Sequence, residues 1–405
     1  MGGGKTSAAI TYMNEHKDKK FIFITPYLGQ VERVKRSCPS MSFVAPVAED
    51  FSTKSESLQR LIRTRQNIVT THQLFERMNK ETEELVRAGG YTLIVDEALG
   101  AINANPIKKE DAELFLEFGY LRINEEGYYE RTEKEYNGTA LNGYFKALQE
   151  ARVHHSDDEV WVCALPAEIF ECFEEVIVLT YMFDAQLHKY YYDLKHIPYK
   201  YIGIKRTLEG GELIYRFTEN LNEVTVPDSI YELSQKIHIF DGNKINSIGD
   251  VSTALSSTWY QKGTAKKCER VRKNIYNVFQ NIYGAKSKDA LWTTFKRHQD
   301  GCTSKRYKKA FLSCNARATN DFANRHYVAY CINVFYNPFL VQHMKRKGIE
   351  LDEDRYALSE MVQFIFRSAI RNGEDIWVYV PSARMRKLLQ DWLKNGLPTK
   401  ERAAA

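Results

Sequence analysis

The sequence opens on Met1-Gly2-Gly3-Gly4-Lys5-Thr6, and this stretch decides how the rest of the chain is interpreted. Glycines followed by Lys and Thr are typical of the end of a phosphate-binding loop, and the alanine-rich segment 7–13 predicts the helix that should follow. Glycines let backbone N–H groups approach a phosphate, and the helix N-terminus adds partial positive charge. We therefore expect Gly2, Gly3, Gly4, Lys5 and Thr6 to bind nucleotide phosphates, with the Thr6 hydroxyl on Mg²⁺.

The complete loop pattern, G-x-x-x-x-G-K-[ST], does not fit inside the sequence, because its first glycine would fall before Met1. The strand that should lead into the loop is also missing, so the expected fold lacks its N-terminal strand. A fragment, a gene start placed too late, or a different kind of loop would each explain this. The same letters also fit the N-myristoylation pattern M-G-x-x-x-[ST]. Motifs further along the chain are needed to distinguish between these interpretations.

Composition predicts a globular protein of two or three domains, since 405 residues carry 43% hydrophobic and 13% aromatic side chains. A net charge of +5 is compatible with a nucleic-acid partner. Seven cysteines without a C-x-x-C pair indicate reduced thiols and no zinc site. The longest apolar runs have the length of strands, so we expect no membrane span. The expected location is the cytoplasm, which is the host cytoplasm if the protein is viral.

Strands and helices alternate through the first half of the chain. Apolar runs at 20–26 and 67–72 predict buried strands, and segments 30–37 and 55–65 have helical spacing. The run Tyr91–Val95 is a further strand, and it ends in Asp96-Glu97-Ala98. An acid at the tip of such a strand can hold the Mg²⁺ of a bound nucleotide, and a second acid can activate water. This order predicts an α/β domain with an ATP site, in which Asp96 binds the metal and Glu97 is catalytic.

These motifs resemble those of superfamily 2 DExD/H-type helicases. The opening loop is similar to motif I, the Thr25-Pro26 strand end to motif Ia, Thr70-Thr71-His72 to motif Ic and Asp96-Glu97-Ala98 to motif II. The strand 176–181 and the helical stretch 185–194 are placed like motif III. The amino-acid sequences of these motifs resemble those of a divergent group of helicases from bacteriophages. The resemblance implies that Thr71 and His72 contact nucleic acid, and it leaves segment 101–160 as an elaboration without an assigned role.

The second half of the chain is similar to the second domain of that family. Residues 310–320 form an apolar strand opening into a polar loop, placed like motif V, so the resemblance implies that Asn315, Arg317 and Thr319 contact nucleic acid. On a helix over 360–371, Gln363, Arg367 and Arg371 recur every four residues on one face. The resemblance to motif VI makes them catalytic, and either Arg367 or Arg371 is the arginine finger, with Arg371 preferred.

We therefore expect two tandem RecA-like (P-loop NTPase) domains, over residues 1–205 and 206–405, with parallel sheets flanked by helices. The expected function is an ATP-dependent helicase or translocase that hydrolyses Mg²⁺-bound ATP at the cleft between these domains. Its partner would be nucleic acid, with single-stranded DNA favoured over RNA, and replication or recombination proteins could join it. Two alternatives stay open: a catalytically impaired module that binds nucleic acid or a protein partner, and the motor ATPase of a DNA-packaging machine.

Overall fold

The computed structural model describes residues 4–26, 28–48, 53–106, 109–123, 128–132, 134, 152–154, 160–224, 230–314 and 321–396. They fall into two compact units. The N-terminal unit contains residues 4–223 together with 337–351, and the C-terminal unit contains the described residues of 224–336 and of 352 onward. The expected domain boundary at residue 205 lies inside a β-hairpin of the N-terminal unit. None of the described helices is long and apolar enough to cross a membrane.

A four-stranded parallel sheet is the centre of the N-terminal unit. Its strands are β1 (Lys20–Thr25), β2 (Ile68–Thr71), β3 (Tyr91–Asp96) and β9 (Glu175–Leu179), in the order β2-β1-β3-β9. Every residue of β3 is buried, as expected for a central strand covered on both faces. The strands predicted at 20–26, 67–72, 91–95 and 176–181 are confirmed. Before β2, Val44 pairs with Ile68 only as an isolated bridge, so residues 42–45 add no strand to the sheet.

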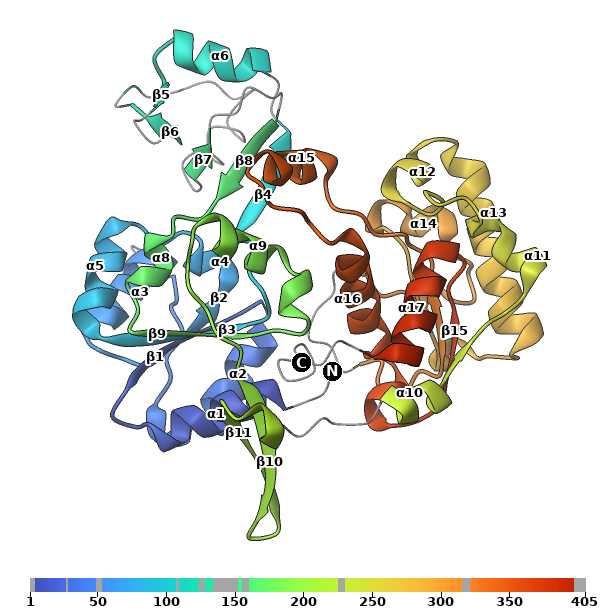
Figure 1. The fold of residues 1–405 in the computed structure, drawn as a ribbon, viewed down its shortest axis with the longest axis horizontal. Helices are drawn as coiled ribbons and strands as arrows, with labels where there is room; N and C mark the ends of the chain where they lie inside the picture. The colour runs from blue at the N-terminus through green and yellow to red at the C-terminus, as the bar shows by residue number, and fades with distance from the viewer. Residues whose placement is uncertain are drawn as a thin grey trace. The chain divides into compact units, whose positions relative to one another are not determined.

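Helices cover both faces of this sheet (Figure 1). The core between the sheet and α1 (Lys5–Glu15) and α2 (Leu28–Ser37) is formed by small and branched side chains under the aromatic rings of β1. On the other face lie α3 (Lys54–Arg63), α4 (His72–Phe75) and α5 (Lys80–Gly89) (Figure 1). The helices predicted from periodicity are therefore confirmed. Further along the chain come α8 (Glu168–Glu171) and α9 (Leu187–Leu194).

The described parts of segment 101–160, which was expected to be an elaboration without an assigned role, form an antiparallel sheet between β3 and β9. Its strand order is β4-β8-β7-β6-β5, and helix α6 follows β4 along the chain. Helix α15 (Pro338–Arg346) comes from the second half of the chain and packs against β4 and β8. The bounds of the elements are β4 Ile102–Pro106, α6 Lys109–Glu117, β5 Leu121–Ile123, β6 Tyr128–Arg131, β7 Arg152–His154 and β8 Val160–Ala164.

A β-hairpin follows α9 at the end of the first expected domain. Strands β10 (Gly203–Glu209) and β11 (Glu212–Thr218) pair antiparallel, and both Gly210 and Gly211 have positive φ, at 58° and 86°. Two central residues with positive φ are what a tight two-residue hairpin turn requires, so Gly-Gly closes the hairpin here. The hairpin packs along α1 through β11 (Figure 1).

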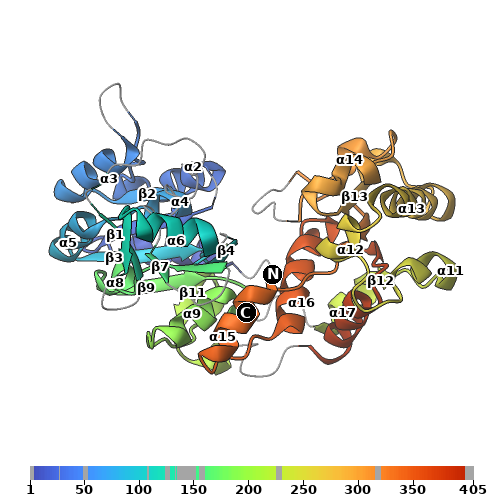
Figure 2. The ribbon, with the colours of Figure 1, turned by 90° about the horizontal axis from the view of Figure 1, so that it is seen from above.

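The C-terminal unit repeats the parallel architecture. Its sheet has the order β12-β15-β14-β13, with β12 (Ile237–Ile239), β13 (Ala290–Thr293), β14 (Tyr327–Tyr330) and β15 (Ile376–Tyr379). Figure 2 shows α13 and α14 beside β13, and all three elements contribute to one buried cluster around Trp292. The helices are α10 Ile230–Lys236, α11 Asn243–Asn246, α12 Ser257–Gln261, α13 Thr264–Tyr276, α14 Gln299–Cys302, α16 Glu353–Ile365 and α17 Ala383–Asn395. The predicted fold class, α/β with parallel sheets flanked by helices, is confirmed in both units.

Two predictions in the C-terminal unit are wrong. The apolar run that starts at Ala310 is not a strand in its described part, since Phe311 makes only an isolated bridge to Trp292. The helix expected to continue through 371 ends at Ile365, and Ser368 is extended, with φ −86° and ψ −172°. This extended residue breaks the helical path, so Arg371 lies on a separate 3₁₀ helix.

Candidate nucleotide site

Asp96 is the centre of a polar cluster at the carboxyl edge of the N-terminal sheet. It ends β3, and its side chain is only 8% exposed. The Thr6 hydroxyl donates to Asp96 Oδ1 at 3.3 Å, and the Thr25 hydroxyl donates to Asp96 Oδ2 at 3.3 Å. Because parallel strands end at the same edge of a sheet, β1 and β3 bring Thr25 and Asp96 together. The expected neighbourhood of Thr6 and Asp96 is therefore present.

The turn before α1 has the backbone that a phosphate-binding loop needs. Gly4 precedes the helix in the left-handed region, with φ 76°, and no side chain caps the first turn. The unpaired N–H groups of a helix start attract anions. A Cβ on Gly4 would lie 2.1 Å from Cδ1 of Tyr215 on β11, so a side chain cannot fit there without moving that ring. Gly2 and Gly3 lie outside the described residues.

Lys5 is the first residue of α1 and is half-buried beside the acidic pair. Burial lowers the pKa of Lys5, while the charges of Glu97 and Asp96 raise it. Lys5 Nζ lies 5.7 Å from the ring centroid of Tyr181, over its face. The ammonium group is therefore close to both carboxylates and to an aromatic face, at the N-terminus of a helix.

The electrostatics of Asp96 fit a cation binder. Burial, reinforced by the charge of Glu97, raises the pKa of Asp96 to about 6, and the hydroxyls of Thr6 and Thr25 lower it. Taking a carboxylate out of water is costly unless a cation or donors compensate it. No group of three or more His, Cys, Asp or Glu residues that could hold a metal is found within the described part of the chain. Mg²⁺ needs only one or two protein carboxylates when phosphates complete its shell, so the residues fit.

Glu97 has an unusual backbone for its residue type. Its φ is 68°, in a region that non-glycine residues rarely occupy, and its N–H donates to the carbonyl of Leu179 at the end of β9. Strained backbone of this kind persists where neighbouring structure holds it, and it is often found at functional sites. The turn after β3 thus fixes Glu97, which is half-buried, next to Asp96.

His72 and His188 support this turn from two sides. His72 Nε2 donates to the backbone carbonyl of Asp96 at 2.9 Å, so its ring is directed at the candidate site. His188 on α9 is buried, and its Nδ1 accepts from the N–H of Leu99 at 3.3 Å. Thr71 is the half-buried last residue of β2. That Thr71 and His72 contact nucleic acid stays a prediction, and the structure gives His72 a contact with Asp96.

Sequence reasoning missed three of these residues as members of the site. Thr25 was noted only as a strand end, although a threonine that ends a strand parallel to β3 must lie near Asp96. His188 and Tyr215 left no signal, because each reaches the site through tertiary packing from α9 or β11.

The remaining predicted residues belong to the C-terminal unit. Gln363 on α16 is buried, Arg367 just after that helix is also buried, and Arg371 is exposed. The three do not share one helix, as explained above. Asn315, Arg317 and Thr319 lie outside the described residues. The catalytic and nucleic-acid roles of all six stay predictions.

Comparisons with known proteins show which family the chain is similar to. A family model described as the YonV C-terminal Rossmann-like domain matches residues 231–393. Among solved structures, the chain is similar to one titled "XPD_Helicase" (TM-score 0.49, 11% identity, 96% of this chain and 93% of that chain). It is also similar to "Structure of S. tokodaii Xpd4" (TM-score 0.44, 11% identity, 98% and 93%).

One relative matches over nearly the whole chain. The SPbeta prophage-derived uncharacterized protein YonV of Bacillus subtilis (strain 168) is 40% identical over 410 residues, which cover 98% of this chain and 97% of that protein. Identity at this level over both full lengths shows common descent and a common fold. The chain belongs to the YonV family.

Proposed function

We propose that this protein is an ATP-dependent nucleic-acid helicase or translocase built on two tandem RecA-like domains. One observation carries the proposal: the buried carboxylate of Asp96 receives hydroxyl hydrogen bonds from Thr6 and Thr25, beside Lys5 at the uncapped start of α1. Together these groups offer a cation ligand, a lysine and the backbone N–H groups of a helix start within one small region. That set suits a triphosphate with its metal ion.

Each residue has a distinct proposed role. The backbone N–H groups after Gly4 and the ammonium of Lys5 would bind the phosphates of ATP. When bound, Mg²⁺ would neutralise phosphate charge, and Asp96 and Thr6 are the residues that would hold it. Glu97 would orient a water molecule and accept its proton. Its fixed backbone would keep the carboxylate in place for that step.

Gln363, Arg367 and Arg371 are proposed to complete catalysis from the C-terminal unit. An arginine stabilises the charge that develops on a transferring phosphoryl group. Coupling hydrolysis to movement along a strand would follow from opening and closing of the two units. Single-stranded DNA is the proposed track, with RNA as the second possibility.

ATP hydrolysis, measured with and without single-stranded DNA or RNA, tests the proposal. We expect nucleic acid to stimulate the wild-type rate, and Glu97→Gln to lower it by about 100-fold or more, since general-base catalysis contributes that much. The matched control is Glu84→Gln, which removes the same charge from an exposed site on α5. Equal rates for wild type and Glu97→Gln would overturn the mechanism.

A further inference from the structure

The cations of the chain are concentrated in one part of the C-terminal unit. Between residues 262 and 309 there are fourteen Lys and Arg against three Asp and Glu, a net charge of +11, whereas the whole chain carries +5. The remainder of the protein is therefore acidic on balance. A local excess of this size creates a positive potential that attracts polyanions.

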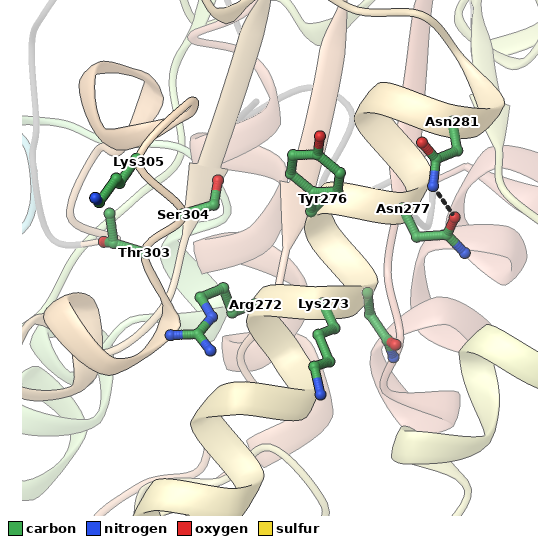
Figure 3. A pocket seen from close by; sticks show the side chains of 9 residues that line it. Arg272, Lys273, Tyr276, Asn277, Asn281, Thr303, Ser304 and Lys305 are labelled. Carbon is green, nitrogen blue, oxygen red and sulfur yellow. Dashed lines mark hydrogen bonds between the residues drawn. The ribbon is translucent and has the colours of Figure 1, made fainter.

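A hollow of about 560 Å³ lies within this basic segment (Figure 3). One side is formed by α13 and the π-helix Asn277–Ile282 that continues it, and the other by the loop 303–305. The Asn281 amide donates to Asn277 Oδ1 at 2.8 Å across the π-helix (Figure 3). A π-helix is rare, and such turns often occur at functional sites.

Three cations line the hollow: Arg272 and Lys273 from α13, and Lys305 from the loop. Glu269 on α13 forms ion pairs with two of these cations. Its Oε1 lies 2.9 Å from Lys273 Nζ and 3.8 Å from Arg272 Nη2. One carboxylate therefore faces two cations on the helix, and Lys305 adds a third charge from the opposite side. The lining keeps a positive balance that a phosphate can neutralise.

An aromatic ring lies among these cations. Tyr276 lines the hollow between the loop and the asparagine pair (Figure 3), and it is 39% exposed. Its ring contacts that of Tyr307 edge-to-face, with centroids 6.2 Å apart. Tyr307 is buried, and its hydroxyl donates to the carbonyl of Ala285 at 2.7 Å. The exposed ring of Tyr276 is thus supported from behind by a fixed one.

The basic loop is held in place by the same tyrosine. The indole N–H of Trp292 on β13 donates to the carbonyl of Tyr307 at 2.8 Å, which ties the segment 305–309 to the sheet. Lys305, Arg306, Lys308 and Lys309 are all exposed around the buried Tyr307. The chain therefore presents these charges from an anchored backbone.

We propose that this hollow and its basic rim are a binding site for single-stranded nucleic acid, with phosphates held by Arg272 and Lys305 and an unpaired base stacked on Tyr276. Cationic grooves that include exposed aromatic rings suit single strands, because every base has a face that can stack. An acidic polypeptide would satisfy the cations but would leave Tyr276 without a planar partner. The site rests on nucleic-acid binding, which belongs to the proposed function, but it does not depend on ATP hydrolysis.

The test is the affinity of the full-length, nucleotide-free protein for a fluorescent oligothymidylate of about 20 nucleotides, with oligouridylate as the RNA arm. The main variant is Arg272→Gln/Lys305→Gln. The charge-matched control is Lys387→Gln/Lys394→Gln, which removes two exposed lysines from α17. We expect the main variant to bind about ten-fold more weakly at low salt, and the control to stay within about two-fold of wild type.

The salt dependence gives a second readout. Each phosphate contact on a single strand contributes about 0.7 to the slope of log affinity against log salt concentration, so the main variant should lose about 1.4. Tyr276→Ala should weaken binding about five-fold or more and leave the salt slope unchanged, because stacking releases no counterions. If the double variant loses its thermal stability, the affinity of Lys305→Gln alone tests the site, because Lys305 lies on an exposed loop.

Equal affinities for the main variant and its control would overturn the proposal. The proposal would also be overturned if polyglutamate displaced the fluorescent oligothymidylate as well as unlabelled oligothymidylate does, since the ligand would then be an acidic polypeptide. Wild-type affinity in Tyr276→Ala would remove the stacking part and with it the preference for single strands. The oligothymidylate affinity is also measured for Glu97→Gln without nucleotide. If this variant lacks ATPase activity but still binds through the hollow, the result supports the binding site independently of the proposed hydrolysis.

Discussion

The two units contain sheets of the same kind whose strand ends differ in chemistry. In the N-terminal sheet, β1 and β3 end in Thr25 and Asp96, whose side chains contact each other. In the C-terminal sheet the four strands end in uncharged residues, which are Ile239, Thr293, Tyr330 and Tyr379. The last three of these are fully buried. One sheet edge therefore carries a carboxylate and a hydroxyl that can act on a ligand, and the other is part of the core.

The C-terminal unit carries its charge elsewhere, on α13 and the loop at 303–309. A shared α/β architecture thus supports different surfaces in the two units, because function depends on side chains and not on the fold itself. If this comparison is correct, changes at the N-terminal strand ends should affect nucleotide chemistry, and equivalent changes in the C-terminal sheet should not.

The largest effect is expected from Asp96→Asn. The amide keeps the size of the side chain but removes the charge, so we expect ATP hydrolysis to fall by about 100-fold or more. Thermal stability should be kept or raised, since the pKa of Asp96, at about 6, lies above its ordinary value and its charge is unfavourable at neutral pH. Thr293→Val, at a strand end of the other sheet, is the control and should hydrolyse ATP normally. Similar losses in both variants would break the comparison.

Gly4→Ala should have the next largest effect. The new Cβ would meet the ring of Tyr215, and alanine is disfavoured at φ 76°. These two costs together amount to about 2 kcal/mol or more of unfolding free energy, measurable by denaturant titration. Tyr215→Ala should relieve the steric part, so the double variant should be more stable than the sum of the single changes predicts. Strict additivity would show that the ring does not restrict this position.

The smallest effect is expected from protonation of His188. Burial lowers its pKa to about 3, with a smaller contribution from His72. Between pH 3 and 6.5 the His188 side chain binds a proton in the unfolded chain but not in the folded protein. The unfolding free energy that depends on this group is therefore fully present above pH 6.5 and is lost as pH falls toward 3. At pH 5 the loss is about 2 kcal/mol relative to pH 7. His188→Gln should show a correspondingly smaller drop in unfolding free energy between these pH values, and an unchanged drop would contradict this assignment.

Much of the N-terminal unit could be predicted from the sequence. Buried strands such as 91–96 are apolar runs of strand length bounded by turns, and helices such as α3 have one apolar face. Once strands are assigned as parallel, residues at their carboxyl ends must lie near one another. The proximity of Thr25 and Asp96 follows from this topology. That of Thr6 and Asp96 was expected from the loop motif, and the structure places their side chains 3.3 Å apart.

The rest depended on contacts between distant residues. The antiparallel subdomain between β3 and β9 has short strands with weak alternation, so local pattern does not define them. Gly210-Gly211 is compatible with both a linker and a hairpin turn, and only pairing of β10 with β11 distinguishes the two. The end of α16 is set by the extended backbone of Ser368, a residue whose type does not stop a helix by itself.

The most direct test of the central claim is equilibrium binding of a fluorescent ATP analogue to the full-length protein, with and without Mg²⁺. If Lys5, Thr6 and Asp96 form a nucleotide site, binding should require Mg²⁺, and Lys5→Ala should weaken it by about ten-fold or more, since a charge-assisted contact is lost. Lys17→Ala, at an exposed position just after α1, should bind like wild type. Binding that is equally tight in Lys5→Ala, or that is unaffected by Mg²⁺, would contradict the account.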